Sequence, residues 1–404
     1  MLYGDGVPLA DVAARFGTPL YAYSAAAIAA RYAEVDQAFA GYPHTLHYAL
    51  KANSTLAVAR LVRRLGAAAD ANSSGEIEVA LRAGFTPGEI VFTGVGKSDA
   101  ELERAIDLGL RSINAESEGE IERIDAIAAG RGVRARVAVR VNPDIDARSH
   151  PHISTGRKDT KFGVAIADAR AMALRMRDRA GVQIVGLHSH VGSQITRLEP
   201  LQHAAEALVA LSEELRGAGV GIEHLDIGGG LGIPYEGQRV PSAAEYAAAV
   251  LPILRPTGLP LILEPGRYLV GQAGVLITRV VDVKPQAGGK LFVIVDAGMT
   301  DLMRPMLYGA YHRIEPIVCS GASDALVDLV GPVCETTDTL GKDRRLPTPA
   351  VGDLMAVFDA GAYGAVMASN YNRRPMPAEV LIEHGQATLV RRRQTIDDLV
   401  AQEL

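Results

Sequence analysis

The sequence has no tryptophan, only two cysteines and no long run of apolar or basic residues. Two cysteines, Cys319 and Cys334, are too few for a disulfide framework. No apolar stretch approaches the roughly 18 residues that a membrane helix needs, so we expect no membrane partner. The longest basic run is Arg391 to Arg393 and the net charge is -6, which argues against nucleic-acid binding, because that needs clustered positive charge. A small-molecule partner is favoured.

The N-terminus shows no basic and apolar signal segment, and the sequence therefore predicts a cytoplasmic protein. Hydrophobic residues make up 48% and charged residues 22% of the 404 residues, which is ordinary for a globular protein with a real core. The length exceeds one typical domain but suits a barrel of about 250 residues with a smaller partner domain.

From about residue 45 to residue 265, short β-branched and apolar runs alternate with amphipathic helical stretches, the pattern of a parallel sheet. About eight such units predict a (β/α)8 TIM-type barrel, hence an α/β fold. The expected strands are 45–50, 67–71, 89–94, 111–115, 136–142, 183–190, 224–228 and 259–264. Helices are expected between them, for example at 54–65, 75–83, 98–108 and 243–254.

After Arg267 the pattern changes to period-2 strands at 275–283, 291–296 and 353–358, broken by glycine and proline. This predicts a C-terminal antiparallel β domain after the barrel. We expect the barrel to span residues 26–267, and residues 1–25, with a candidate strand at 20–23, to join residues 268–404 in a β-sandwich or barrel-like domain.

Chemically active side chains follow the expected strands. Because a TIM-type barrel carries its active site at the carboxyl ends of its strands, these residues should meet on one face. They are Lys51, Asp70, His190 with Ser193, the triplet Gly228, Gly229 and Gly230, and Glu264 with Gly266 and Arg267.

Each of these residues also has a simpler interpretation. Partial burial would lower the pKa of Lys51 and free it to form a Schiff base, but one lysine after a strand is more often solvated. Three glycines let backbone N–H groups approach a phosphate, or only make a tight turn. Glu264 could hold a pyridine nitrogen protonated or simply pair with Arg267. His190 could stack on a cofactor ring or be a core residue. Their co-occurrence favours the functional interpretation.

Four motifs make the pattern specific: Tyr-Ala-Leu-Lys-Ala-Asn at 48–53, His-Val-Gly-Ser at 190–193, Gly-Gly-Gly at 228–230 and Glu-Pro-Gly-Arg at 264–267. In this order, and along nearly the whole chain, the sequence resembles the fold-type III pyridoxal-phosphate decarboxylases. The resemblance implies pyridoxal 5'-phosphate as cofactor, and no metal is expected. The segment Ser-Ser-Gly-Glu at 73–76 departs slightly from the family's usual Ser-Gly-Gly-Glu.

The resemblance also implies roles. Lys51 would form the Schiff base with the cofactor, His190 would stack on its ring and Glu264 would pair with its pyridine nitrogen. Asp70 matches a position near the stacking histidine. The phosphate and its surroundings would be held by Ser193, Gly228, Gly229, Gly230, Gly266 and Arg267.

Segments 142–144, 152–156, 161–163 and 303–308 resemble the diaminopimelate decarboxylases within this family. This implies decarboxylation of meso-2,6-diaminopimelate to L-lysine, the last step of lysine biosynthesis. Arg267 and Arg304, with Tyr308, offer two guanidinium groups for a distal carboxylate, which ornithine and lysine lack. The simpler interpretation of Arg304 is a surface ion pair.

Gly-Pro-Val-Cys-Glu at 331–335 resembles the family motif in which Cys334 protonates the carbanion and Glu335 binds the distal ammonium. In the family this segment enters the partner subunit's active site, which implies a homodimer with shared sites. Thr336 and Thr337 replace the usual serine pair, and a buried apolar cysteine is the simpler interpretation of Cys334. Tyr363 matches a residue that contacts both cofactor and substrate.

Three alternatives remain open. A decarboxylase of ornithine, arginine or lysine would share the cofactor machinery, but Arg304 and Tyr308 argue against it. A relative of alanine racemase would be expected to place an arginine, not Glu264, at the pyridine nitrogen. A cofactor-binding regulatory pseudoenzyme is disfavoured by the presence of both Lys51 and Cys334.

Overall fold

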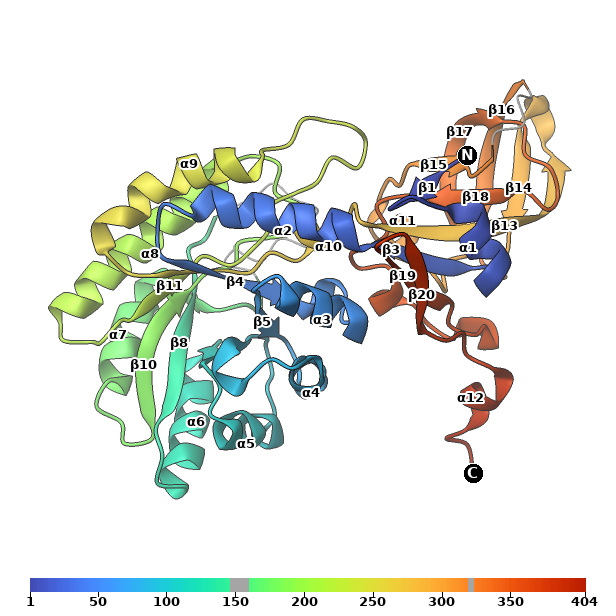
Figure 1. The fold of residues 1–404 in the computed structure, drawn as a ribbon. Helices are drawn as coiled ribbons and strands as arrows, with labels where there is room; N and C mark the ends of the chain where they lie inside the picture. Colours follow the sequence, from blue (N-terminus) through green and yellow to red (C-terminus); the bar gives the residue numbers. More distant parts are fainter. Residues whose placement is uncertain (146–159, 319–322) are drawn as a thin grey trace. The chain divides into compact units, whose positions relative to one another are not determined.

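The computed structural model describes residues 1–145, 160–318 and 323–404, and internal packing divides the chain into two units (Figure 1). We call them the barrel unit, Arg31–Ile233 with Arg239–Tyr268, and the β unit, Met1–Ala30 with Pro234–Gln238 and Leu269–Leu404. In the part of the chain that is described, no helix is long and apolar enough to cross a membrane.

The barrel unit contains the predicted parallel barrel. Eight strands pair in parallel, and pairing between β8 and β10 closes the sheet. The prediction of a TIM-type barrel with eight strands is therefore confirmed. The strands are β4 (His44–Ala49), β5 (Ala68–Ala71), β6 (Ile90–Phe92), β7 (Ser112–Ala115), β8 (Ala135–Asn142), β10 (Val182–His188), β11 (His224–Asp226) and β12 (Leu261–Leu263), and the short β9 (Val164–Ala165) pairs with β8.

Helices follow the strands in sequence and lie outside them (Figure 1). Several begin at a serine whose hydroxyl accepts a backbone N–H of the first turn, as Ser98 does from Glu101 and Ser242 from Glu245. Such caps satisfy donors that have no partner within the helix. The helices are α3 (Leu56–Arg64), α4 (Ser74–Ala83), α5 (Asp99–Leu108), α6 (Glu118–Gly130), α7 (Ile166–Met176), α8 (Glu199–Gly217) and α9 (Ala243–Leu254); α2 (Ala25–Phe39) precedes β4.

The β unit is built on a large, mostly antiparallel sheet in the order β17-β16-β14-β13-β3-β19-β20, with β15 and β18 attached beside β13. Its strands are β3 (Leu20–Ser24), β13 (Gly274–Pro285), β14 (Leu291–Val295), β15 (Ile314–Pro316), β16 (Asp324–Val330), β17 (Thr339–Pro347), β18 (Leu354–Val357), β19 (Ala378–Glu383) and β20 (Gln386–Arg391). This unit also contains a two-stranded sheet of β1 (Tyr3–Gly4) and β2 (Val7–Pro8) and the helices α1 (Leu9–Phe16), α11 (Arg304–Tyr308) and α12 (Ile396–Val400). The short helix α10 (Arg267–Val270) begins in the barrel unit and ends in the β unit.

The N-terminal strand occurs as expected. β3 lies between β13, to which it is antiparallel, and β19, to which it is parallel. Leu20, Ile277 and Val380 from these three strands share one buried apolar cluster. The predicted antiparallel β domain is confirmed for most of its strand pairs, and the structure adds two parallel pairs, β3–β19 and β14–β16. Parallel pairs need long crossover connections, and both pairs are separated by such connections in the sequence.

Candidate active site

Lys51 lies just beyond the end of β4, in the short 3-10 turn Leu50–Ala52. Its Nζ is 3.7 Å from Oδ2 of Asp70, and its side chain is 31% exposed. Asp70 lies on β5 and is fully buried. Burial and then the charge of Glu264 raise the pKa of Asp70, while Lys51 opposes the shift. The amine and the carboxyl therefore meet at the mouth of the barrel, where Lys51 remains accessible.

Glu264 follows β12 directly and is buried. Its backbone N–H donates to the carbonyl of Gly228 at 2.7 Å, and Nε2 of His188 lies 3.3 Å from its Oε2. Burial alone would raise the pKa of Glu264, but the imidazole of His188 and then the ammonium of Lys51 outweigh it and hold that pKa well below the usual range. Glu264 is thus an anion at neutral pH, as a partner for a protonated ring nitrogen must be.

His190 lies two residues beyond β10 and is partly buried. Its Nδ1 accepts the backbone N–H of Gly229 at 3.2 Å. Burial, and then the positive charges of Lys51 and Arg140, lower the pKa of His190 well below its usual value. The imidazole of His190 is therefore neutral. An uncharged imidazole is better suited than a charged one to stack on a cofactor ring.

The glycine triplet forms a turn that side chains would fill. Gly228 and Gly230 have φ of +64° and +104°, a region that favours glycine. A Cβ on Gly228 would lie 2.6 Å from the carbonyl oxygen of Ser189, and one on Gly229 would lie 3.0 Å from the carbonyl carbon of Glu264. No side chain therefore covers the backbone of this turn at the mouth of the barrel, as a phosphate-binding turn requires.

Arg267 lies three residues after Glu264, in the segment that follows β12. It is buried, and its NH2 donates to Oγ of Ser193 at 2.9 Å. Gly266 precedes it, where a Cβ would lie 3.0 Å from Cβ of Ala52 and 3.1 Å from Cβ of Ala49. The structure thus joins a guanidinium and a hydroxyl, two groups that bind phosphate, in one barrel mouth with the bare turn.

The unusual 73–76 turn is well formed. Oγ of Ser73 accepts the N–H of Glu76 and caps α4, while Oε2 of Glu76 accepts the N–H of Asn72 at 2.7 Å. Burial raises the pKa of Glu76 to about 7. The amide of Asn72 also donates to Oδ2 of Asp70 at 3.2 Å, so the turn supports Asp70.

In the β unit, Arg304 is buried at the start of α11, so the surface ion-pair interpretation is wrong. Its NH1 lies 2.8 Å from Nε2 of His312, and its guanidinium lies 4.6 Å from the ring centre of Tyr235. Tyr308, one turn further along α11, is partly buried. The guanidinium is thus held in a defined orientation by an imidazole and an aromatic face.

Cys334 and Glu335 are exposed on the β unit. The interpretation of Cys334 as a buried apolar residue is therefore wrong in the described chain. Nδ2 of Asn372 donates to Sγ of Cys334 at 3.0 Å, and the hydroxyl of Tyr371 donates to Oε1 of Glu335 at 2.8 Å. Asn372 has a φ of +54°, a backbone conformation rare for a residue with a side chain.

The loop of Cys334 is tied down by Asp338. Its carboxylate accepts the N–H groups of Met299 at 2.6 Å and Val333 at 2.7 Å. One buried side chain thus joins the segment before α11 to the segment that carries Cys334. Tyr363 has a φ of +56° and is partly buried. A bulky residue at positive φ marks backbone strain, which is often found at functional sites.

Residues 152–156, one of the segments that suggested the substrate, lie outside the described residues, as does Cys319.

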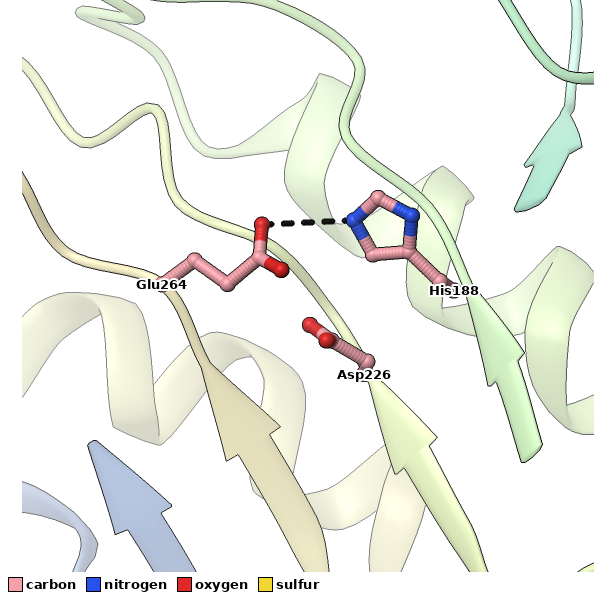
Figure 2. Close-up of side chains that lie close together, drawn as sticks. All are labelled: His188, Asp226 and Glu264. Atoms are coloured by element: carbon pink, nitrogen blue, oxygen red, sulfur yellow. Dashed lines mark hydrogen bonds and ion pairs between the residues drawn. The ribbon is translucent and has the colours of Figure 1, made fainter. Parts of the chain in front are cut away.

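Sequence reasoning missed two residues of the barrel mouth. His188, on β10, and Asp226, on β11, project beside Glu264 (Figure 2). Both residues end their strands, so inspecting the last polar residue of each expected strand, as well as the residues that follow it, could have found them. One ligand atom of each of the three lies within 4.8 Å of the others, a donor set that could also hold a divalent cation.

The barrel mouth fits pyridoxal phosphate on its own geometry. It combines an accessible amine, an ionised buried carboxylate, a neutral imidazole and a bare glycine turn beside Arg267. Residues 25–271 match the family model of the pyridoxal-dependent decarboxylases, pyridoxal binding domain. The chain therefore belongs to the pyridoxal-dependent decarboxylases.

Similar proteins show which of the pyridoxal-dependent decarboxylases this chain resembles. The chain is 48% identical to a diaminopimelate decarboxylase of Pseudomonas aeruginosa, covering 100% of this chain and 96% of that one. It is 46% identical to the enzyme of Neisseria meningitidis, covering 100% and 99%. The structure of diaminopimelate decarboxylase from Helicobacter pylori complexed with L-lysine superposes with a TM-score of 0.94 at 41% identity, covering 98% and 99%. The chain belongs to the diaminopimelate decarboxylase family, and pyridoxal phosphate is its cofactor.

Proposed function

We propose that this chain removes carbon dioxide from the D-configured end of meso-2,6-diaminopimelate and yields L-lysine, and that it works in the cytoplasm as a homodimer. The observation that carries the proposal is Glu264, a buried carboxylate held ionised by His188 and Lys51 in a barrel mouth. A cofactor ring bound there accepts the electrons left behind when the carboxylate departs.

Within the barrel unit, each residue has one task. Lys51 would hold the cofactor through its amine, and the carboxylate of Glu264 would accept a hydrogen bond from the protonated ring nitrogen. His190, a neutral imidazole, would stack on the ring, and Asp70 lies beside Lys51. The phosphate is held by the backbone N–H groups of the 228–230 turn, by Ser193 and by the Gly266–Arg267 turn.

The β unit supplies substrate recognition. Arg304, held by His312 and Tyr235, would bind the distal carboxylate together with Tyr308. Tyr363 contacts both cofactor and substrate. Glu335, oriented by Tyr371, binds the distal ammonium, and the thiol of Cys334 from the neighbouring subunit donates a proton to the carbon that has lost its carboxylate.

Carbon dioxide release tests the substrate. The purified protein with pyridoxal phosphate is incubated with meso-diaminopimelate, ornithine, arginine or lysine, and we expect release from diaminopimelate alone. An Arg304→Lys variant keeps the charge but loses the planar fork, so the KM for diaminopimelate should rise about tenfold or more. Exposed Arg313→Lys is the matched control. Preference for ornithine, arginine or lysine would contradict the substrate assignment.

Mixing two inactive variants tests the shared site. Lys51→Ala should lose the Schiff-base absorbance, whereas Cys334→Ala should keep it and lose turnover. If each active site takes Lys51 from one subunit and Cys334 from the other, mixed dimers contain one intact site. Unfolding and refolding the two variants together should then restore roughly a quarter of wild-type activity. No recovery in a mixture of confirmed dimers would place both residues in one subunit's site.

A further inference from the structure

Glu264 shares its buried surroundings with a second carboxyl group, that of Asp226. We propose that Asp226 is a positioning residue that carries a proton and donates it as a hydrogen bond to Glu264, and that with His188 it keeps Glu264 the anion facing the cofactor. The proposal rests on the function proposed above, in which Glu264 partners the ring nitrogen.

The three side chains come from neighbouring strands. His188 ends β10, Asp226 ends β11 and Glu264 follows β12, and their side chains point toward one another (Figure 2). His188 and Asp226 are 0% exposed and Glu264 is 3% exposed. Bulk solvent therefore does not reach these groups, and their hydrogen bonds depend mainly on one another and on the nearby backbone.

Counting donors and acceptors requires a proton between the carboxyl groups. Oδ1 of Asp226 accepts the N–H of Gly228 at 2.9 Å, but its buried Oδ2 has no hydrogen-bond partner among the described residues. An ionised carboxylate only accepts hydrogen bonds, so two adjacent ionised carboxylates would leave Oδ2 without a partner and repel each other. A proton on Asp226 solves both problems, because the O–H then donates to Glu264.

The surrounding charges decide which carboxyl holds the proton. Burial and then the charge of Glu264 raise the pKa of Asp226 well above its usual value. Burial alone would raise the pKa of Glu264, but His188, which contacts it directly, and then the ammonium of Lys51 lower it instead. Asp70 also faces this cluster, and its pKa is raised. The pKa values of the two carboxyl groups are thus shifted in opposite directions, so that Asp226 is neutral and Glu264 is ionised, as in other acid–base pairs.

A divalent cation is the other occupant that this donor set allows. Proximity is its only support, because Asp226 already accepts a backbone N–H and His188 already contacts Glu264. A cation would also compete with the ring nitrogen for the charge of Glu264. A shared proton needs no additional component and leaves that charge available.

Infrared spectroscopy detects the proton directly. Full-length protein labelled with 13C-aspartate is measured at mildly alkaline pH, both as apoenzyme and with pyridoxal phosphate. We expect a C=O band of a protonated carboxylic acid that shifts with the label, disappears in Asp226→Asn and persists in the control Asp70→Asn. Absence of any labelled carboxylic acid band, or a set of such bands that is unchanged by Asp226→Asn, would overturn the proposal.

Cofactor affinity provides the second readout. Asparagine can donate an N–H where the aspartic acid donates an O–H, so Asp226→Asn should bind pyridoxal phosphate within about threefold of wild type. Asp226→Ala loses the donor and should bind roughly ten- to a hundredfold more weakly. Equal affinities in all three proteins would refute the proposal. So would an asparagine variant as weak as the alanine variant, or a stoichiometric divalent cation in purified wild type that Asp226→Asn lacks.

The two proposals fail separately. If the infrared band behaves as expected but another amino acid is the preferred substrate, the shared proton stands and the substrate assignment falls. If diaminopimelate is decarboxylated and the band is absent, only the role of Asp226 is wrong.

Discussion

Replacing Gly229 by alanine tests whether the glycine turn must be bare. The added Cβ would lie 3.0 Å from the carbonyl carbon of Glu264 and still closer to its oxygen. Both are backbone atoms, so the contact cannot be relieved by rotating a side chain of Glu264. The backbone of Gly229 is also held in place, because its N–H donates to Nδ1 of His190. Gly229 does not have a positive φ, so the effect is steric and not conformational strain.

The expected cost is that of overpacking, about 1–3 kcal/mol in the free energy of unfolding. Part of the strain should reach Glu264, weakening pyridoxal phosphate binding about tenfold or more. Urea unfolding of the apoenzyme, followed by circular dichroism, measures stability without the contribution of bound cofactor. Titration of the apoenzyme with pyridoxal phosphate measures the affinity.

The matched control is Gly119→Ala. Gly119 lies in α6, and a Cβ there would meet nothing within 4 Å. Removing a helical glycine should stabilise the protein by up to about 1 kcal/mol. If Gly229→Ala unfolds at the wild-type urea concentration and binds the cofactor normally, the turn tolerates a side chain and the account of the phosphate site is wrong.

Two further predictions concern buried charge in the barrel. Lys97→Met should destabilise the protein by about 3–5 kcal/mol in urea unfolding, because Nζ of Lys97 donates to Glu120 at 2.7 Å and Glu120 would be left buried without this partner. Adding Glu120→Gln to Lys97→Met should recover part of the lost stability. A Lys97→Met variant as stable as the wild type would contradict this account. Burial lowers the pKa of His47 to about 4, so between pH 6.5 and 4 the unfolded chain binds a proton that the folded chain refuses. Stability should therefore fall by about 3 kcal/mol from this group as the pH drops through that range, and His47→Asn should flatten the profile of unfolding free energy against pH; an unchanged slope would show that His47 is not responsible.

The strand and helix pattern of the barrel could be predicted because each element has its own local signal. Period, β-branched content and capping serines all lie within one segment, and Ser98 and Ser242 begin helices as their sequences indicate. The parallel pairs of the β unit could not be predicted. Pairing of β14 with β16 depends on a long connection whose course no local pattern specifies.

Most of the candidate site was predictable for a related reason. In a barrel, residues at strand ends converge whatever their separation in sequence, and Lys51 and Glu264 do so from opposite ends of the barrel sequence. Their roles remain predictions. The contact of His188 with Glu264 and the position of Asp226 were missed, because the order β10-β11-β12 places them together only after the sheet closes.

The central place of β3 in its sheet has a consequence for biosynthesis. β3 is synthesised long before its two neighbours, β13 and β19, which begin at Gly274 and Ala378. At about 5–20 residues per second, the first strand waits on the order of ten seconds or longer with both edges open. The barrel can form during this interval, but a nascent chain that stops before β19 presents an unpaired edge, and we expect such fragments to be captured by chaperones or to aggregate.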